Sequence, residues 1–156
     1  MKTKIMKIAA ILLMLAGIVS CGKDDKSCSC EEGGSNEPIS LESTRWELAG
    51  IMDVKTCALR ELEPKDCDDC YYLYFNTDST AQGKSVMNLI FVSLTPKIMF
   101  GVMTEVYDSE IGDVQLFYDA MKTITSCAVT ENELKFCCNG GKSYLLYKKE
   151  EIVYYN

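Results

Sequence analysis

The sequence predicts a mainly β (α+β) domain, built as an antiparallel small barrel or a strongly curled sheet of six to eight strands with one helix. Apolar and polar residues alternate with a period of two through most of residues 41–149. A single segment changes to the helical period, and helices and strands do not alternate, so a parallel sheet is not favoured. We expect the helix to cap an open end or edge of the sheet.

The first strand is predicted in TRWELAG (residues 44–50), where Trp46 and Leu48 share one face. Residues 53–69 are polar, rich in turn formers and contain Pro64, which predicts a loop.

Three further strands are expected before the helix. They lie in YYLYF (residues 71–75), AQGKSVMNLIFVS (residues 81–93) and IMFGVMT (residues 98–104). We interpret the second as one long or bulged strand, with Gly83 at the bulge or bend.

The helix is predicted in GDVQLFYDAMK, residues 112–122. Val114, Phe117, Tyr118 and Met121 recur there at positions i, i+3, i+4 and i+7, and Asp113 is a suitable N-cap.

Two hairpins are expected after the helix. SCAV and ELKFCC flank Thr130-Glu131-Asn132, and ELKFCC and SYLLYKK flank Asn139-Gly140-Gly141-Lys142. The Asn-Gly pair is a strong hairpin signal.

The N-terminus has the pattern of a lipoprotein signal peptide, residues 1–20. Three lysines precede an apolar run over residues 8–19, which is shorter than the roughly 20 residues of a spanning helix. The run ends in Ile18-Val19-Ser20-Cys21, which resembles a bacterial lipobox. That resemblance implies cleavage before Cys21, which then carries a thioether-linked diacylglycerol on its sulfur and usually an N-acyl chain, with palmitate among the acyl groups. The membrane is then a partner through the anchor.

A small charged cluster follows the cysteine. Lys23, Asp24 and Asp25 lie in GKDDK, which resembles the export signal of surface lipoproteins of the Bacteroidetes. The resemblance implies an outer-membrane protein exposed at the cell surface. The alternative is a solvated spacer, which predicts a lipoprotein facing the periplasm.

Composition divides the remaining chain and excludes several functions. Residues 21–40 are polar and predict a flexible acidic tether, residues 41–149 the folded domain, and residues 150–156 a C-terminal tail. After cleavage the chain has 13 Lys and Arg against 23 Asp and Glu, a net charge of −10. This charge argues against nucleic-acid binding. The chain has no histidine, the commonest general base and metal ligand.

Eight cysteines besides Cys21 predict disulfides in an exported protein. Cys57 is expected to bond Cys67 or Cys70 across the long loop. Cys67 and Cys70 also have the C-x-x-C spacing of zinc and redox motifs, but they lie among turn formers, which favours a structural role. Cys28 and Cys30 fall in the tether and are not expected to brace the core.

A second disulfide is predicted between Cys127 and Cys137. If the hairpin turns around Asn132, each cysteine lies five residues from its centre and the two oppose each other. Cys138 then points to the opposite face, with Leu134 and Phe136, as a buried thiol.

The order of these elements is similar to the META domain of small bacterial outer-membrane lipoproteins. The resemblance rests on Trp46, YLYFNTDST, GKSVMN, Thr104, Glu110, FYDAM and the terminal NELKFCC and YLLYK segments. It implies a META or lipocalin-like fold, no catalytic residues, no cofactor and a loosely defined role in envelope stress.

We therefore expect a non-enzymatic, lipid-anchored protein that binds a partner or acts in the envelope, with no metal site. The alternative is a small hydrolase, or a lipocalin-like carrier of an apolar or glycan ligand. Asp68-Asp69 and Glu150-Glu151 are carboxylate pairs, interpreted as solvated charges. Exposed tyrosines can stack on sugar rings or bury in a protein partner, but we interpret those of the domain as core or half-buried strand residues.

Overall fold

The computed structural model describes residues 28–30, 39–104 and 111–151 of the 156-residue chain. Its elements, in chain order, are β1 (Thr44–Asp53), β2 (Ala58–Arg60), β3 (Tyr72–Thr77), β4 (Thr80–Lys84), β5 (Leu89–Ser93), β6 (Met99–Val102), α1 (Val114–Lys122), β7 (Ser126–Val129), β8 (Glu133–Cys138), the 3-10 turn η1 (Asn139–Gly141) and β9 (Ser143–Glu150). Among the described residues, no helix is long and apolar enough to span a bilayer.

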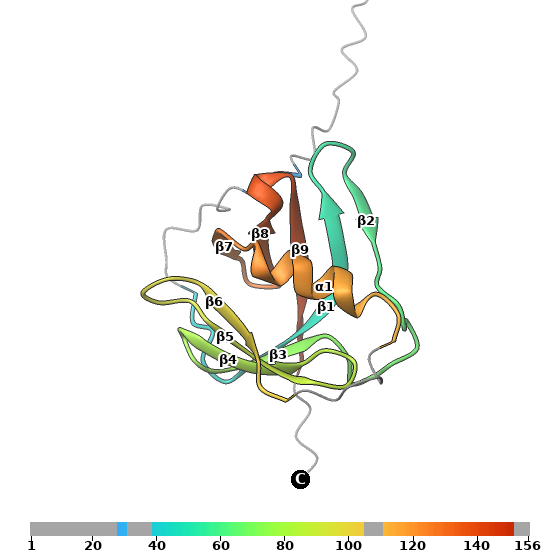
Figure 1. The fold of residues 1–156 in the computed structure, drawn as a ribbon. Coiled ribbons are helices and arrows are strands. Elements are labelled where there is room, and N and C mark those ends of the chain that lie inside the picture. Colours follow the sequence, from blue (N-terminus) through green and yellow to red (C-terminus); the bar gives the residue numbers. More distant parts are fainter. Residues whose placement is uncertain (1–27, 31–38, 105–110, 152–156) are drawn as a thin grey trace, which may run out of the picture.

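The predicted fold class is confirmed. Eight strands follow one another in the order β6-β5-β4-β3-β1-β9-β8-β7, and the short β2 pairs with β1 beside this path. Every pairing is antiparallel. The sheet curls into a half-barrel, and α1 crosses its hollow side (Figure 1).

Strand β1 bends in the middle, at Gly50. The register against β9 shifts between Leu48 and Gly50, where β1 leaves β3 and begins to pair with β2. Gly50 has φ +149°, and a Cβ atom there would lie 2.4 Å from the carbonyl oxygen of Arg60. Only glycine is compatible with this close backbone approach. Gly50 therefore allows β1 to pair with β3 before it and with β2 after it.

The core fills the space between α1 and the sheet. Trp46 and Phe117 are fully buried there, and the ring of Phe117 meets that of Tyr71 edge to face at a centroid distance of 5.1 Å. The predicted helix is confirmed with Val114, Phe117 and Met121 on its buried face. Asp113 is at its N-cap, but its carboxylate binds Arg60 and the backbone N–H of Glu63 instead of capping the helix.

The predicted long or bulged strand over residues 81–93 is two strands, β4 and β5, joined by a turn at residues 85–88. Gly83 lies in regular register between Leu73 and Ile90, so it is not a bulge. The carbonyl oxygen of Tyr72 would lie 2.0 Å from a Cβ atom at Gly83, and close backbone approach explains the glycine.

Candidate functional site

The sequence-predicted anchor and export residues Cys21, Lys23, Asp24 and Asp25 lie outside the described residues, as does the signal peptide of residues 1–20. The first described residues, 28–30, lie beside the β1–β2 turn and η1 (Figure 1).

A disulfide joins Cys28 to Cys57 just after β1, with the two Cα atoms 5.6 Å apart. The expectation that Cys57 bonds Cys67 or Cys70 is wrong, because those two residues bond each other. Sequence reasoning missed Cys28, since its polar surroundings favour a tether. The available signal was an even number of cysteines in an exported chain.

Cys30 also lies against the domain. Its side chain packs on a small cluster on the outer face of the sheet, formed by Cys137, Tyr144 and Leu146. The Cys137 thiol donates to the carbonyl oxygen of Cys30 at 3.3 Å. The expectation that Cys28 and Cys30 do not brace the folded chain is therefore wrong: one is bonded covalently to it and the other is packed on it.

The predicted Cys127–Cys137 disulfide is wrong by one residue of register. Cys127 pairs with Phe136, and Cys137 pairs with Ser126. The turn closes at Thr130, whose N–H donates to Glu133 at 2.8 Å, so its loop has two residues instead of three. Cys127 contacts the main core and Cys137 lies on the outer face. Cys138 is a buried thiol of the main core, as predicted.

Burial disfavours the thiolate forms of Cys30 and Cys138. Desolvation first, and then the hydrogen bond and charge of Cys137, raise the pKa of Cys30 to about 12. Burial also raises the pKa of Cys138. Because the thiolate is the nucleophile, neither residue has the properties of a reactive cysteine at neutral pH.

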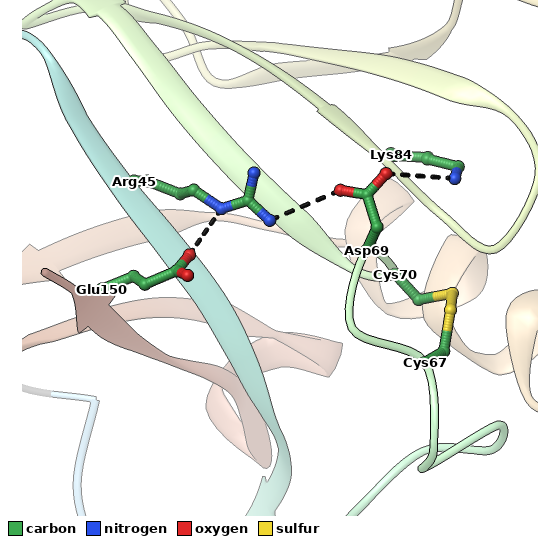
Figure 2. Close-up of polar contacts among 6 residues, drawn as sticks. All are labelled: Arg45, Cys67, Asp69, Cys70, Lys84 and Glu150. Carbon is green, nitrogen blue, oxygen red and sulfur yellow. Dashed lines mark hydrogen bonds and ion pairs between the residues drawn. A yellow bond between two sulfur atoms is a disulfide. The ribbon is translucent and has the colours of Figure 1, made fainter. Parts of the chain in front are cut away.

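The CDDC loop (residues 67–70) takes part in an array of charged side chains around Arg45 of β1. Asp69 lies between the two bonded cysteines and pairs with Arg45 and Lys84, each at 3.4 Å (Figure 2). Arg45 also binds Glu150 and stacks on the ring of Tyr72 at 4.0 Å. One carboxylate from each predicted acidic pair therefore meets the same guanidinium. These carboxylates are half exposed, so the array contributes little stability.

Several hollows open on the described surface, and two of them border the segments named above. A small one of about 150 Å³ borders the Cys67–Cys70 disulfide and contains Glu47, Glu61 and Lys65. A larger one of about 540 Å³ lies at the opposite end of the sheet from η1, between the β7–β8 turn and the end of β9, and is lined by Glu131 and Glu150 among others. Within the described residues, no group of three or more His, Cys, Asp or Glu side chains is placed to hold a metal ion.

An apolar patch covers the outer face of β5 and β6. Leu89 and Phe91 are exposed on β5, and Met99 and Met103 are exposed on and after β6. Strand β6 ends the strand order in the described part of the chain. An apolar face beside a sheet edge is a common protein-binding surface.

The curled sheet, the one α-helix of the described residues and the disulfide-bound segment at residues 28–30 define a small disulfide-bonded β domain. A protein of Tannerella forsythia (strain ATCC 43037) with the name "Putative lipoprotein" is 41% identical to this chain over 150 residues, which cover 95% of the chain and 97% of the relative. The chain belongs to this lipoprotein family. No family model matches the chain, and no solved structure does.

Proposed function

We propose that this lipoprotein is a non-enzymatic domain of META type, anchored by acylated Cys21 in the outer membrane and exposed at the cell surface. The observation that carries the proposal is the lipobox cysteine in a chain 41% identical to another lipoprotein. The order of strands with one helix on the hollow side supports the META assignment.

A binding role is favoured over catalysis. The pKa values of Cys30 and Cys138 are raised by burial, which removes them as nucleophiles at neutral pH. The carboxylates of Asp69 and Glu150 are engaged by Arg45. The apolar β5–β6 patch then serves as the binding surface, and its occupant is an extended apolar segment of another envelope protein that adds to the β6 edge.

The anchor is tested by replacing Cys21. Cys21→Ser leaves no thiol to acylate, so radiolabelled palmitate is not incorporated and the protein accumulates unprocessed or leaves the membrane fraction. Equal label in the variant and the wild type contradicts the proposal. Surface exposure is tested separately by changing Lys23, Asp24 and Asp25 to alanine. If the variant is as accessible to protease on intact cells as the wild type, the cluster is only a spacer.

The role is tested by two measurements, one on the purified protein and one in whole envelopes. Robust turnover in a broad hydrolase screen contradicts the non-enzymatic assignment. Crosslinking in whole envelopes is compared for the wild type and for Phe91→Ser, which makes the patch polar without entering the buried core. Loss of a specific crosslinked protein in the variant supports the patch as the binding surface, and an unchanged pattern excludes it.

A further inference from the structure

The chain enters the folded domain at two opposite ends. Cys28 is bonded to Cys57 beside the β1–β2 turn. Ser40 and Leu41 bind Asp78 in the β3–β4 turn, where the Ser40 hydroxyl and the Leu41 N–H donate to the carboxylate at 2.7 and 2.8 Å. Strand β1 has 10 residues and runs between the two ends, which a strand rise of about 3.3 Å per residue places roughly 30 Å apart.

The disulfide therefore decides which end is nearest the membrane. With the bond, seven residue steps separate the proposed anchor at Cys21 from Cys28, and this chain reaches at most about 25 Å. Without the bond, only the noncovalent contacts of Cys30 hold the chain at this end, and the next attachment is at Ser40, on the far end of the domain. When those contacts release, the same anchor leads to the opposite end of the sheet.

The two ends of the domain also differ in charge: the Cys57 end has exposed lysines, and the far end has mainly carboxylates. Lys55 and Lys142 are exposed at the Cys57 end, where the N–H of Val54 donates to the carbonyl oxygen of Lys142 at 3.0 Å and holds the two turns together. The nearby Asp53 carboxylate accepts hydrogen bonds from Thr56. The far end has three carboxylates, of Glu131, Glu150 and Glu151, and one lysine, Lys149, around its hollow. Lipid phosphates attract the lysine end and repel the acidic end.

We propose that the Cys28–Cys57 disulfide holds the β1–β2 turn and η1 against the phosphate headgroups of the bilayer that carries the anchor, and turns the acidic end outward. The occupant of this face is the lipid headgroup surface. The inference rests on the proposed acylation of Cys21.

The orientation is tested on the full-length, lipidated and oxidised protein in vesicles of phosphatidylcholine and phosphatidylglycerol. A membrane-impermeant, amine-reactive reagent is added, and labelling of each lysine is followed by peptide mass spectrometry. We expect Lys55 and Lys142 to label several-fold more slowly than Lys149, which is exposed beside the acidic hollow. Equal rates, or slower labelling of Lys149, overturn the proposal.

The role of the disulfide is tested by Cys28→Ser/Cys57→Ser. The protection of Lys55 and Lys142 is expected to disappear, because only the noncovalent contacts of Cys30 then hold the chain at this end, and once they release about 20 residues separate the anchor from Ser40. The control is Cys67→Ser/Cys70→Ser, which removes the other disulfide and is expected to keep the protection. Protection that persists in the first variant, or is lost in both, overturns the proposal.

Two further readouts keep the outcomes distinct. Trp46 is the only tryptophan and is fully buried, so its blue-shifted emission shows that each variant is folded. Flotation with the vesicles reports the anchor itself. A wild-type protein that does not float contradicts the proposed function, whereas a floating protein without lysine protection contradicts only the orientation.

Discussion

The ring of Phe91 lies directly over Gly101 on the neighbouring strand. The two residues are paired across β5 and β6, and a Cβ atom at Gly101 would lie 2.2 Å from Cε1 of Phe91. The ring of Phe91 therefore occupies the space that a side chain at Gly101 would fill. In this arrangement an aromatic ring covers a glycine on an edge strand.

Gly101→Ala is expected to destabilise the domain by about 1 kcal/mol, because the ring must leave its position. The cost is at the low end for overpacking, since Phe91 is exposed and its ring can move. Denaturant unfolding measures it. In Phe91→Ala/Gly101→Ala the added cost of the alanine is expected to vanish, and additive effects of the two substitutions contradict the contact.

The two disulfides are expected to contribute unequal stability. Their sequence separations are 29 and 3 residues, so the chain-entropy model gives about 3.5 kcal/mol for Cys28–Cys57 and roughly 1.5–2 kcal/mol for Cys67–Cys70. Urea unfolding of the two double Cys→Ser variants compares them. A larger loss in the Cys67/Cys70 variant refutes this ranking.

Native-state alkylation is expected to be slow at Cys30 and Cys138. Burial raises the pKa of both thiols, so the reactive thiolate is scarce at pH 8. Iodoacetamide labelling before and after unfolding, followed by mass spectrometry, gives the ratio of rates. Peptide mapping of the same non-reduced sample is expected to yield the Cys28–Cys57 and Cys67–Cys70 links, and a Cys127–Cys137 link contradicts the register described.

Tyr147→Phe is expected to raise stability by about 1 kcal/mol. The Tyr147 hydroxyl is buried and has no hydrogen-bond partner among the described residues, so removing it relieves an unsatisfied polar group. Thermal or denaturant unfolding measures the gain. Tyr144→Phe is a control on the same strand, because Tyr144 is also buried but is not left unsatisfied.

The same tyrosine predicts a pH dependence. Burial raises the pKa of Tyr147 above its ordinary value near 10, so the hydroxyl ionises in the unfolded chain before it does in the folded one. The part of the free energy of unfolding that depends on a neutral Tyr147 is therefore fully present below pH 10 and is lost as the pH rises further. Above pH 10 the free energy of unfolding of the wild type is expected to fall more steeply with pH than that of Tyr147→Phe. Denaturant unfolding at several pH values measures both, and parallel pH dependences contradict the prediction.

Asp78→Ala is expected to speed amide hydrogen exchange at Leu41 and Glu42. Their N–H groups donate to the Asp78 carboxylate at 2.8 and 3.0 Å, and the Ser40 hydroxyl and these amides lower its pKa. The contact is therefore present above the ordinary pKa of an aspartate and lost as the pH falls through the lowered one. Asp68→Ala is the control. Equal exchange rates at Leu41 and Glu42 in both variants contradict the role of the Asp78 carboxylate.

The repeating patterns of the sequence predicted most of the elements because they reflect burial directly. Val114, Phe117 and Met121 share a helical face and are all buried. The turn formers at residues 139–142 mark the β8–β9 connection, where Gly140 has φ +67°. These signals are local, so a single sequence contains them in full.

The disulfides depended on information that the local pattern lacks. A turn of two or three residues at Glu131-Asn132 preserves the alternation of β8, but only the shorter one separates Cys127 from Cys137. The Cys28–Cys57 bond depends on where residues 28–30 lie against the folded domain. No periodicity encodes such a path, so polarity alone misleads at Cys28 and Cys30.

The position of β9 makes closure of the sheet a late event in folding. It pairs with β1 along eight positions and with β8 on its other side, so these two strands, which are far apart in the sequence, are joined only through residues 143–150. A chain that has been synthesised only as far as β8 therefore has unpaired edges on β1 and β8, and these edges are covered when the last strand of the domain adds to the sheet.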